Sequence, residues 1–286
     1  MLTVRDLMRE MIARLEEAGV SEPRPGASLL LSAILNVERG VLPLVYADPV
    51  TEEQACIARD WTARRCRHEP VQYILGLWEF AGRKVHVGPG ALIPRPETEE
   101  WLDRLTNIIP NYISVGEPWA FADIGTGTGI IGLNLAARFP TAFGLLSDLS
   151  PAALGWAKRN LGVFPEAEGR VGLVQGDLTT MLRSGALDLL VSNPPYIARE
   201  EMAGLMRDVR EWEPALALDG GAAGVEPYRR LLADALHVVR PGGLIAVEHG
   251  HGQRRALLGL AAPGLEPVEI FSDVVGLERC LVWKKK

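Results

Sequence analysis

Apolar residues at helical spacing dominate the first quarter of the chain. Thr3 can cap a helix that Gly19 ends, and its apolar positions are Val4, Leu7, Met8, Met11, Ile12 and Leu15. A second helix is predicted in "PGASLLLSAILN", and a third begins at Thr51, where two acidic residues suit the positive end of the helix dipole. We expect residues 1–75 to form a small helical bundle that docks a substrate.

The pattern changes between residues 76 and 98, where "LWEFAGRKVHVGPGALIPRPETE" begins with alternating apolar and polar residues. Gly82 and the Gly-Pro-Gly at 88–90 favour turns. This segment is predicted to be a β-hairpin linker.

Strands alternate with helices over residues 99–286. The predicted strands are "WAFADIG", "AFGLLSD", "RVGLVQGD", "LDLLVSN", "GLIAVEHG", "EPVEIFSD" and "ERCLVWK". Helical patterns such as "GIIGLNLAARF", "SPAALGWAKRNLG" and "EPYRRLLADALHVV" separate most of them. Strands that are apolar on both faces and alternate with helices predict a parallel sheet covered on each side. The predicted fold class is therefore α/β, with a Rossmann-like sheet.

A glycine-rich loop follows the first of these strands in "DIGTGTGI". Gly125, Gly127 and Gly129 let the backbone approach a ligand closely, and the helix that follows favours an anionic group. The spacing is GxGxG, whereas dinucleotide sites have GxGxxG, and no Lys-Ser/Thr pair of a P-loop is present. The loop therefore argues against a dinucleotide and against ATP.

Acidic residues end the next two strands. Asp148 can accept both hydroxyls of a ribose, although it or Ser150 can also simply cap the next helix. Asp177, followed by Leu178, ends the third strand, where an adenine has room. These three strand ends together fit a nucleoside-containing cofactor. S-adenosylmethionine fits best, because it offers a carboxylate to the glycine loop and needs no pyrophosphate site.

The fourth strand runs directly into Asn193, Pro194, Pro195 and Tyr196. Proline holds the residue before it extended and ends the strand ladder. The side-chain oxygen of Asn193 and the carbonyl of Pro194 then become two fixed acceptors that suit a substrate NH₂ group, and Tyr196 can pack against a planar one. A rigid turn with a structural Asn is the alternative, but beside a glycine loop the pattern favours methyl transfer to a planar nitrogen by positioning.

"DIGTGTG", Asp148 and "NPPY" together resemble the class I amino-methyltransferases. "PVQYILG", "ALIPRPETE" and "EWEPALALDGGAAG", with the N-terminal helices, resemble more closely the peptide chain release factor glutamine methyltransferases. The resemblance implies methylation of the N5 amide nitrogen of the glutamine in the GGQ motif of class 1 release factors, by S-adenosylmethionine with S-adenosylhomocysteine as product. Family members often have an aromatic residue where this chain has Leu178.

The resemblance also assigns site residues. The implied cofactor contacts are Gly125, Thr126, Gly127, Thr128, Gly129, Asp148, Asp177, Leu178 and Asn193. The implied catalytic residues are Asn193, Pro194 and Tyr196, and Pro195 and Arg95 join them in binding the substrate. Arg95 and Glu97 either line the cleft or form ion pairs or a hinge, and the role of Glu213 stays open.

A formal net charge of −6 argues against a nucleic-acid amino-methyltransferase that acts on adenine N6 or guanine N2, since such a protein needs a basic surface. An intact NPPY argues against a noncatalytic cofactor-binding or docking module. The three cysteines have no metal-ligand spacing, so no metal is expected. No apolar run reaches the roughly 18 residues of a membrane span, and the N-terminus carries charges throughout and lacks a continuous hydrophobic signal region. We expect a cytoplasmic monomer whose preferred release factor is left open.

Overall fold

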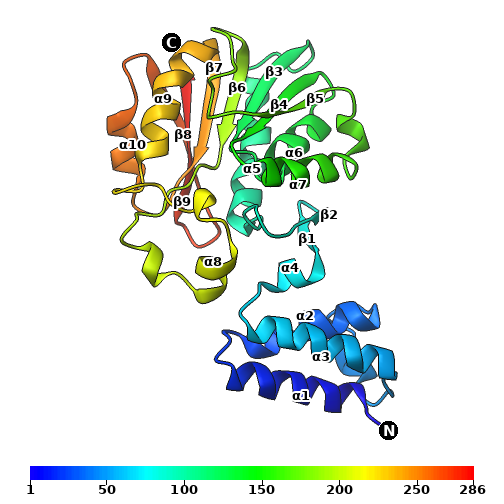
Figure 1. Cartoon of the computed structure of the whole chain (residues 1–286). Coiled ribbons are helices and arrows are strands. Elements are labelled where there is room, and N and C mark those ends of the chain that lie inside the picture. Colours follow the sequence, from blue (N-terminus) through cyan, green and yellow to red (C-terminus); the bar gives the residue numbers. More distant parts are fainter. The chain divides into compact units, whose positions relative to one another are not determined.

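A computed structural model describes residues 1–286, which form two compact units. The smaller unit comprises Met1–Leu77 and Met206–Trp212, and the larger unit comprises Trp78–Leu205 and Glu213–Lys286. Figure 1 colours both units along the sequence. None of the helices is both long enough and apolar enough to span a membrane.

The smaller unit is a bundle of short helices, as the apolar spacing predicted. Its elements are α1 (Val4–Glu17), α2 (Pro23–Leu35), the 3-10 turn η1 (Leu42–Val45), α3 (Glu52–Cys66), α4 (Val71–Leu75) and α8 (Arg207–Trp212). Thr3 and Thr51 both cap their helices, each in a reciprocal capping box that satisfies exposed N–H groups of the first turn. The buried core consists of apolar side chains from α1, α2, α3 and α4 together with Val20 and Leu42.

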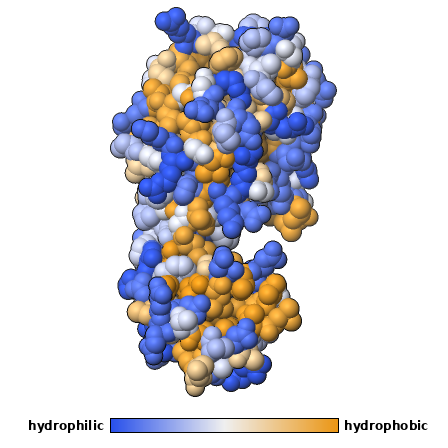
Figure 2. Space-filling model, turned by 90° about the vertical axis from the view of Figure 1, so that its right-hand side faces the viewer, coloured by the Kyte–Doolittle hydropathy of each residue, from blue (hydrophilic) through white to orange (hydrophobic).

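Helix α8 belongs to the smaller unit although it lies far along the chain. The buried guanidinium of Arg65 donates to Asp208 Oδ2 at 3.2 Å, and Trp212 Nε1 donates to the carbonyl of Arg67 at 3.1 Å. The sequence pattern assigned these residues to the α/β region, because a six-residue helix is too short for its apolar spacing to indicate which core it joins. Apolar residues also gather on a face of the smaller unit (Figure 2), and its exposed apolar residues include Leu44 at 82%.

The predicted hairpin is present as β1 (Leu77–Phe80) and β2 (Arg83–His86). Asn160 ties β2 to the rest of the larger unit. Its Oδ1 accepts from His86 N at 2.6 Å, and its Nδ2 donates to the carbonyls of His86 and Thr128 at 3.0 and 2.9 Å. Asn160 is fully buried, so these bonds satisfy an amide that burial would otherwise penalise.

A seven-stranded sheet forms the centre of the larger unit, in the order β5-β4-β3-β6-β7-β9-β8. Its strands are β3 (Trp119–Ile124), β4 (Ala142–Asp148), β5 (Val171–Gln175), β6 (Leu187–Ser192), β7 (Val239–Glu248), β8 (Leu265–Ser272) and β9 (Glu278–Lys285). Every predicted strand is confirmed. The first five strands in this order are parallel, but β9 runs antiparallel to both neighbours, so the expectation of a wholly parallel sheet is wrong at this edge. The segment 273–277 between β8 and β9 is too short for a parallel crossover, which needs about a dozen residues.

Helices cover both faces of the sheet (Figure 1). The helices are α5 (Pro96–Ile108), α6 (Ile130–Arg138), α7 (Pro151–Leu161), α9 (Glu226–Val238) and α10 (Arg254–Leu260), with 3-10 turns η2 (Ile109–Asn111), η3 (Pro165–Ala167), η4 (Met202–Gly204) and η5 (Ala215–Ala217). One core holds side chains of α5 and α6, the other those of α9 and α10.

The strand order reverses between β3 and β6. From β3 the chain adds β4 and β5 on one side, and then returns to add β6 and β7 on the other. In such open sheets ligands bind beyond the carboxyl ends of the strands at this switch point. The register pairs Ile124 with both Ser147 and Ser192, so the glycine loop, Asp148 and Asn193 leave the sheet side by side.

Candidate active site

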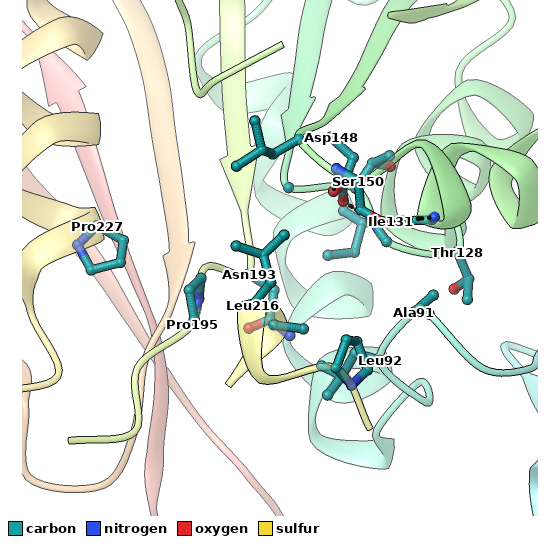
Figure 3. Close-up of a pocket in the computed structure, with 18 of the residues that line it drawn as sticks. Ala91, Leu92, Thr128, Ile131, Asp148, Ser150, Asn193, Pro195, Leu216 and Pro227 are labelled. Carbon is teal, nitrogen blue, oxygen red and sulfur yellow. Dashed lines mark hydrogen bonds between the residues drawn. The ribbon is translucent and has the colours of Figure 1, made fainter. Parts of the chain in front are cut away.

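A cavity of about 340 Å³ opens at the switch point, a volume within the roughly 300–1,000 Å³ of small-molecule sites. Ten of the residues singled out in the sequence line it: Arg95, Gly125, Thr126, Gly127, Thr128, Asp148, Asp177, Leu178, Asn193 and Pro195. Figure 3 shows Asp148, Thr128 and Asn193 reaching this space from different segments. Gly129, Pro194 and Tyr196 do not line the cavity.

The glycines of the loop after β3 have two different tasks. All three have positive φ, at 70° for Gly125, 58° for Gly127 and 84° for Gly129. A Cβ on Gly125 or Gly127 would meet nothing within 4 Å, whereas one on Gly129 would lie 3.0 Å from the Cβ of Ala157. The first two glycines therefore form an open turn that a ligand can approach, and the third lets α6 pack against α7.

Asp148 is fixed by backbone donors on both sides. Its Oδ2 accepts from Gly127 N and its Oδ1 from Ser150 N, both at 2.8 Å. The cap of α7 is Ser150, whose Oγ accepts from Ala153 N at 3.2 Å. Burial raises the pKa of Asp148 above the usual range, against the lowering effect of these bonds. Each carboxylate oxygen has a further lone pair for a ligand, while Ser150 is the residue that caps α7.

Asp123 supports the glycine loop from beneath. Its Oδ2 accepts from Thr126 Oγ1 at 2.6 Å and from Gly132 N at 2.9 Å. Its Oδ1 is buried and has no hydrogen-bond partner. Burial raises the pKa of Asp123 to about 6. Asp123 was not among the predicted site residues, although it begins the quoted "DIGTGTG".

The end of β5 presents Asp177 and Leu178 to the cavity. Leu178 has a φ of 51°, which is unusual for a residue with a branched side chain. Asp177 Oδ2 accepts from Arg230 Nη2 of α9 at 2.6 Å, and both side chains are about half exposed. Arg230 therefore lies beside the place where the sequence predicts an adenine.

The NPPY segment leaves the tip of β6 in three directions. Asn193 and Pro195 line the cavity, and Pro194 is buried. Tyr196 packs against the core that α9 covers, and burial raises the pKa of its phenol well above the usual range. Tyr196 is therefore a neutral hydroxyl at ordinary pH.

Glycines and one glutamine hold the backbone of Tyr196. Gln253 Nε2 donates to the carbonyls of Tyr196 and Gly224 at 2.9 and 3.1 Å. A Cβ on Gly220 would lie 2.8 Å from Tyr196 Cα, and one on Gly224 would lie 2.4 Å from Tyr196 O. The glycines of "EWEPALALDGGAAG" thus make room for the NPPY backbone.

Replacing Gly224 by alanine is expected to lower the free energy of unfolding by about 3 kcal/mol, because it places an alanine in the left-handed region and displaces the part-buried Tyr196 carbonyl, which accepts from Gln253. Gly169 is the matched control, since it has a φ of 72° and nothing within 4 Å of its Cβ position. Gly169→Ala is expected to cost only about 1 kcal/mol. Urea denaturation measures both, and equal costs would contradict this account.

Arg95 and Glu213 form an ion pair at the edge of the cavity. Arg95 Nη2 lies 2.5 Å from Glu213 Oε1, and Ile93 N donates to Glu213 Oε2 at 3.0 Å. Glu213 is buried, and it therefore fixes the PRPET segment against the segment after NPPY. Glu97 lies 3.8 Å from Arg279 and does not line the cavity.

Sequence reasoning missed several residues around the cavity. The apolar part of the wall that the sequence did not single out includes Leu92, Leu216, Ala217 and Pro227, and it lies beside Pro214, which was named with Glu213. Thr98 also lines it, and its hydroxyl bonds to the buried Glu248 at the end of β7. Glu213 and Pro214 had a weak sequence signal, because they stand together in "EWEP". Glu248 also had a weak signal, because it is an acidic residue at a strand end. Leu216 and Ala217 of η5 had no sequence signal.

Two family models match the chain. One, described as the PrmC N-terminal domain, matches residues 6–76, and the other, described as a methyltransferase small domain, matches residues 99–212. The matched regions cover the predicted helical region and the part of the sheet that carries the glycine loop, Asp148 and NPPY.

Full-length relatives are similar throughout. The release factor glutamine methyltransferase of Nitratidesulfovibrio vulgaris is 39% identical over 282 residues, which cover 97% of this chain and 93% of that protein. The protein of the same name from Moorella thermoacetica is 38% identical, with 98% of both chains covered. Among solved structures, the hMettl16 catalytic domain in complex with MAT2A 3′UTR hairpin 6 has a TM-score of 0.52, 18% identity and 82% coverage of both chains, which shows a shared fold.

Proposed function

Since this chain belongs to the family of release factor glutamine methyltransferases, we propose that it transfers a methyl group from S-adenosylmethionine to the N5 amide nitrogen of the GGQ glutamine in class 1 release factors. The observation that carries this proposal is that Asn193 lines the same cavity as the glycine loop and Asp148. An acceptor for an amide NH₂ and a place for a nucleoside therefore face one space.

The residues of the cavity fit S-adenosylmethionine. Gly125 and Gly127 leave an open turn for its carboxylate, and the Asp148 carboxylate is held with lone pairs to spare for its ribose hydroxyls. Leu178 and Arg230 are in position to cover its adenine. When bound, S-adenosylmethionine supplies an electrophilic methyl group on a positively charged sulfur.

The protein's part in the reaction is to align and polarise the glutamine amide. Its nitrogen is a poor nucleophile, because the lone pair is delocalised into the carbonyl. Asn193 Oδ1 accepts one of its N–H bonds, which raises electron density on nitrogen and aims the lone pair at the methyl carbon. Pro194, whose carbonyl the sequence predicts as the second acceptor, is buried and does not line the cavity, so that role stays a prediction. After transfer the methylated nitrogen is acidic and releases its proton to solvent water, so no strong base is needed.

The helical region is assigned to docking the release factor. The match of residues 6–76 to a domain of the same family and the apolar face in Figure 2 support this assignment. We also propose a cytoplasmic location, because translation takes place there, and a monomeric state. Neither the cavity nor the relatives identify the preferred release factor.

The proposal is tested by incubating the purified protein with labelled S-adenosylmethionine and a class 1 release factor. Label is expected in the release factor and is expected to disappear when the glutamine of its GGQ motif is changed to alanine. Parallel samples contain DNA or ribosomal RNA in place of the release factor. Labelling of a nucleic acid without labelling of the release factor would identify the enzyme as a nucleic-acid amino-methyltransferase.

A further inference from the structure

A buried polar cluster lies behind Asn193, formed by Glu248 of β7 and by Thr98 and Trp101 of α5. Glu248 Oε2 accepts from Thr98 Oγ1 at 2.5 Å and from Trp101 Nε1 at 2.6 Å. All three side chains are 2% exposed or less. Burying a carboxyl group costs free energy unless donors compensate it, so this cluster is expected to serve a purpose.

The cluster sets the direction of the Thr98 hydroxyl. An indole N–H can only donate and an ionised carboxylate can only accept, so the ionised Glu248 accepts at Oε2 from both Trp101 and Thr98. Burial raises the pKa of Glu248, and these two hydrogen bonds act against that rise. A hydroxyl has one proton, and Thr98 directs its proton to the same oxygen. Toward its other neighbours Thr98 Oγ1 is therefore an acceptor only.

The neighbour of Thr98 on the cavity side is Asn193, whose Nδ2 lies 3.5 Å from Thr98 Oγ1. The reverse orientation of the Asn193 amide would place two oxygens together with no proton between them. The amide is consequently held with its nitrogen toward Thr98 and its oxygen away from it. Because Asn193 lines the cavity, that oxygen is available to a ligand.

We propose that Thr98 and Glu248 are positioning residues that orient Asn193 so that its Oδ1, and not its Nδ2, faces the NH₂ group of the substrate. This inference rests on the proposed function, because the orientation matters only if the substrate is a donor. Neither residue touches the reacting atoms. Gln253 and the adjacent glycines fix the other end of NPPY, so both ends of the segment are held.

Removal of the Thr98 hydroxyl tests the proposal. Thr98→Val keeps the shape of the side chain, and Thr98→Ala removes the hydroxyl with less risk of a steric clash. Both are expected to lower kcat for release factor methylation by about 10- to 100-fold, since a reacting group loses its alignment. The KM for the release factor and the Kd for S-adenosylhomocysteine are expected to stay within about twofold.

Two further variants separate positioning from general packing. Thr98→Ser keeps the hydroxyl and is expected to retain most of kcat. Thr106→Val is a matched control on the same helix, because the buried Thr106 hydroxyl donates only to the carbonyl of Asp103, at 2.7 Å. Its kcat is expected to equal that of the unmodified protein.

The inference is wrong if both Thr98→Val and Thr98→Ala keep normal kcat, or if every Thr98 variant, Thr98→Ser included, loses kcat and cofactor affinity together. The two proposals fail in different ways. If the unmodified protein does not label a release factor, the proposed function fails. If it does and the hydroxyl proves dispensable, only the orientation by Thr98 and Glu248 fails.

Discussion

Asn193→Ala is expected to lower the rate of release factor methylation by about 100- to 1,000-fold, the usual effect of removing one preorganised hydrogen-bonding group from a reacting centre. The alanine cannot accept the substrate N–H, so the amide nitrogen loses both its alignment and its added electron density. Pro194 and Pro195 still end the strand, so the backbone of the cavity is expected to stay in place.

Single-turnover kinetics with labelled S-adenosylmethionine measure this rate, and calorimetry measures cofactor affinity, which is expected to change little. Asn134→Ala is a suitable control, because the Asn134 amide donates to the carbonyl of Ile130 within α6 and does not line the cavity. A normal rate for Asn193→Ala would rule out the acceptor mechanism altogether.

Asp148→Ala is expected to weaken the binding of S-adenosylmethionine by about 100-fold or more, because hydrogen bonds to a charged group contribute about 1.5–3 kcal/mol each. The ribose loses its acceptors, and the glycine loop also loses the carboxylate that accepts a hydrogen bond from Gly127 N at 2.8 Å. Asp148→Asn retains one acceptor oxygen and is expected to bind with intermediate affinity. Unchanged affinity in Asp148→Ala would show that the ribose does not bind to this carboxylate.

Binding is also expected to depend on pH with a definite sign. The ribose hydroxyls need an acceptor, which the ionised Asp148 supplies, so affinity falls as pH is lowered and the carboxylate takes up a proton. Burial raises the pKa of Asp148, so this loss is expected to begin at a higher pH than for an exposed aspartate. Calorimetric titrations over a pH series follow the loss, which is expected to be absent in Asp148→Asn.

Local sequence patterns predicted most of the fold. Runs of apolar residues identified every strand of the sheet, and Thr3 and Thr51 marked two helix starts through their capping chemistry. The antiparallel direction of β9 was missed, because apolar content does not distinguish parallel from antiparallel strands at a buried edge. The short segment before Glu278 was the available signal, since it leaves no room for a crossover helix.

The candidate site was predicted where its residues follow strands in sequence. The glycine loop, Asp148, Asp177 and Asn193 each lie at or just beyond the carboxyl end of a strand, and a parallel sheet brings such positions to one edge. Thr98 and Glu248 meet across 150 positions of sequence, and no local motif pairs them. Contacts of this kind depend on how α5 packs on the sheet, which periodicity does not specify.

The membership of residues 206–212 in the smaller unit limits how the chain can be dissected. A recombinant fragment ending at Leu77 would lack Asp208 and Trp212, and would leave the buried guanidinium of Arg65 without its carboxylate partner. A complementary fragment beginning at Trp78 would carry α8 without the helices it packs on. Pull-down or calorimetric studies of release factor recognition should therefore use the intact polypeptide, with substitutions on the helical surface in place of truncations.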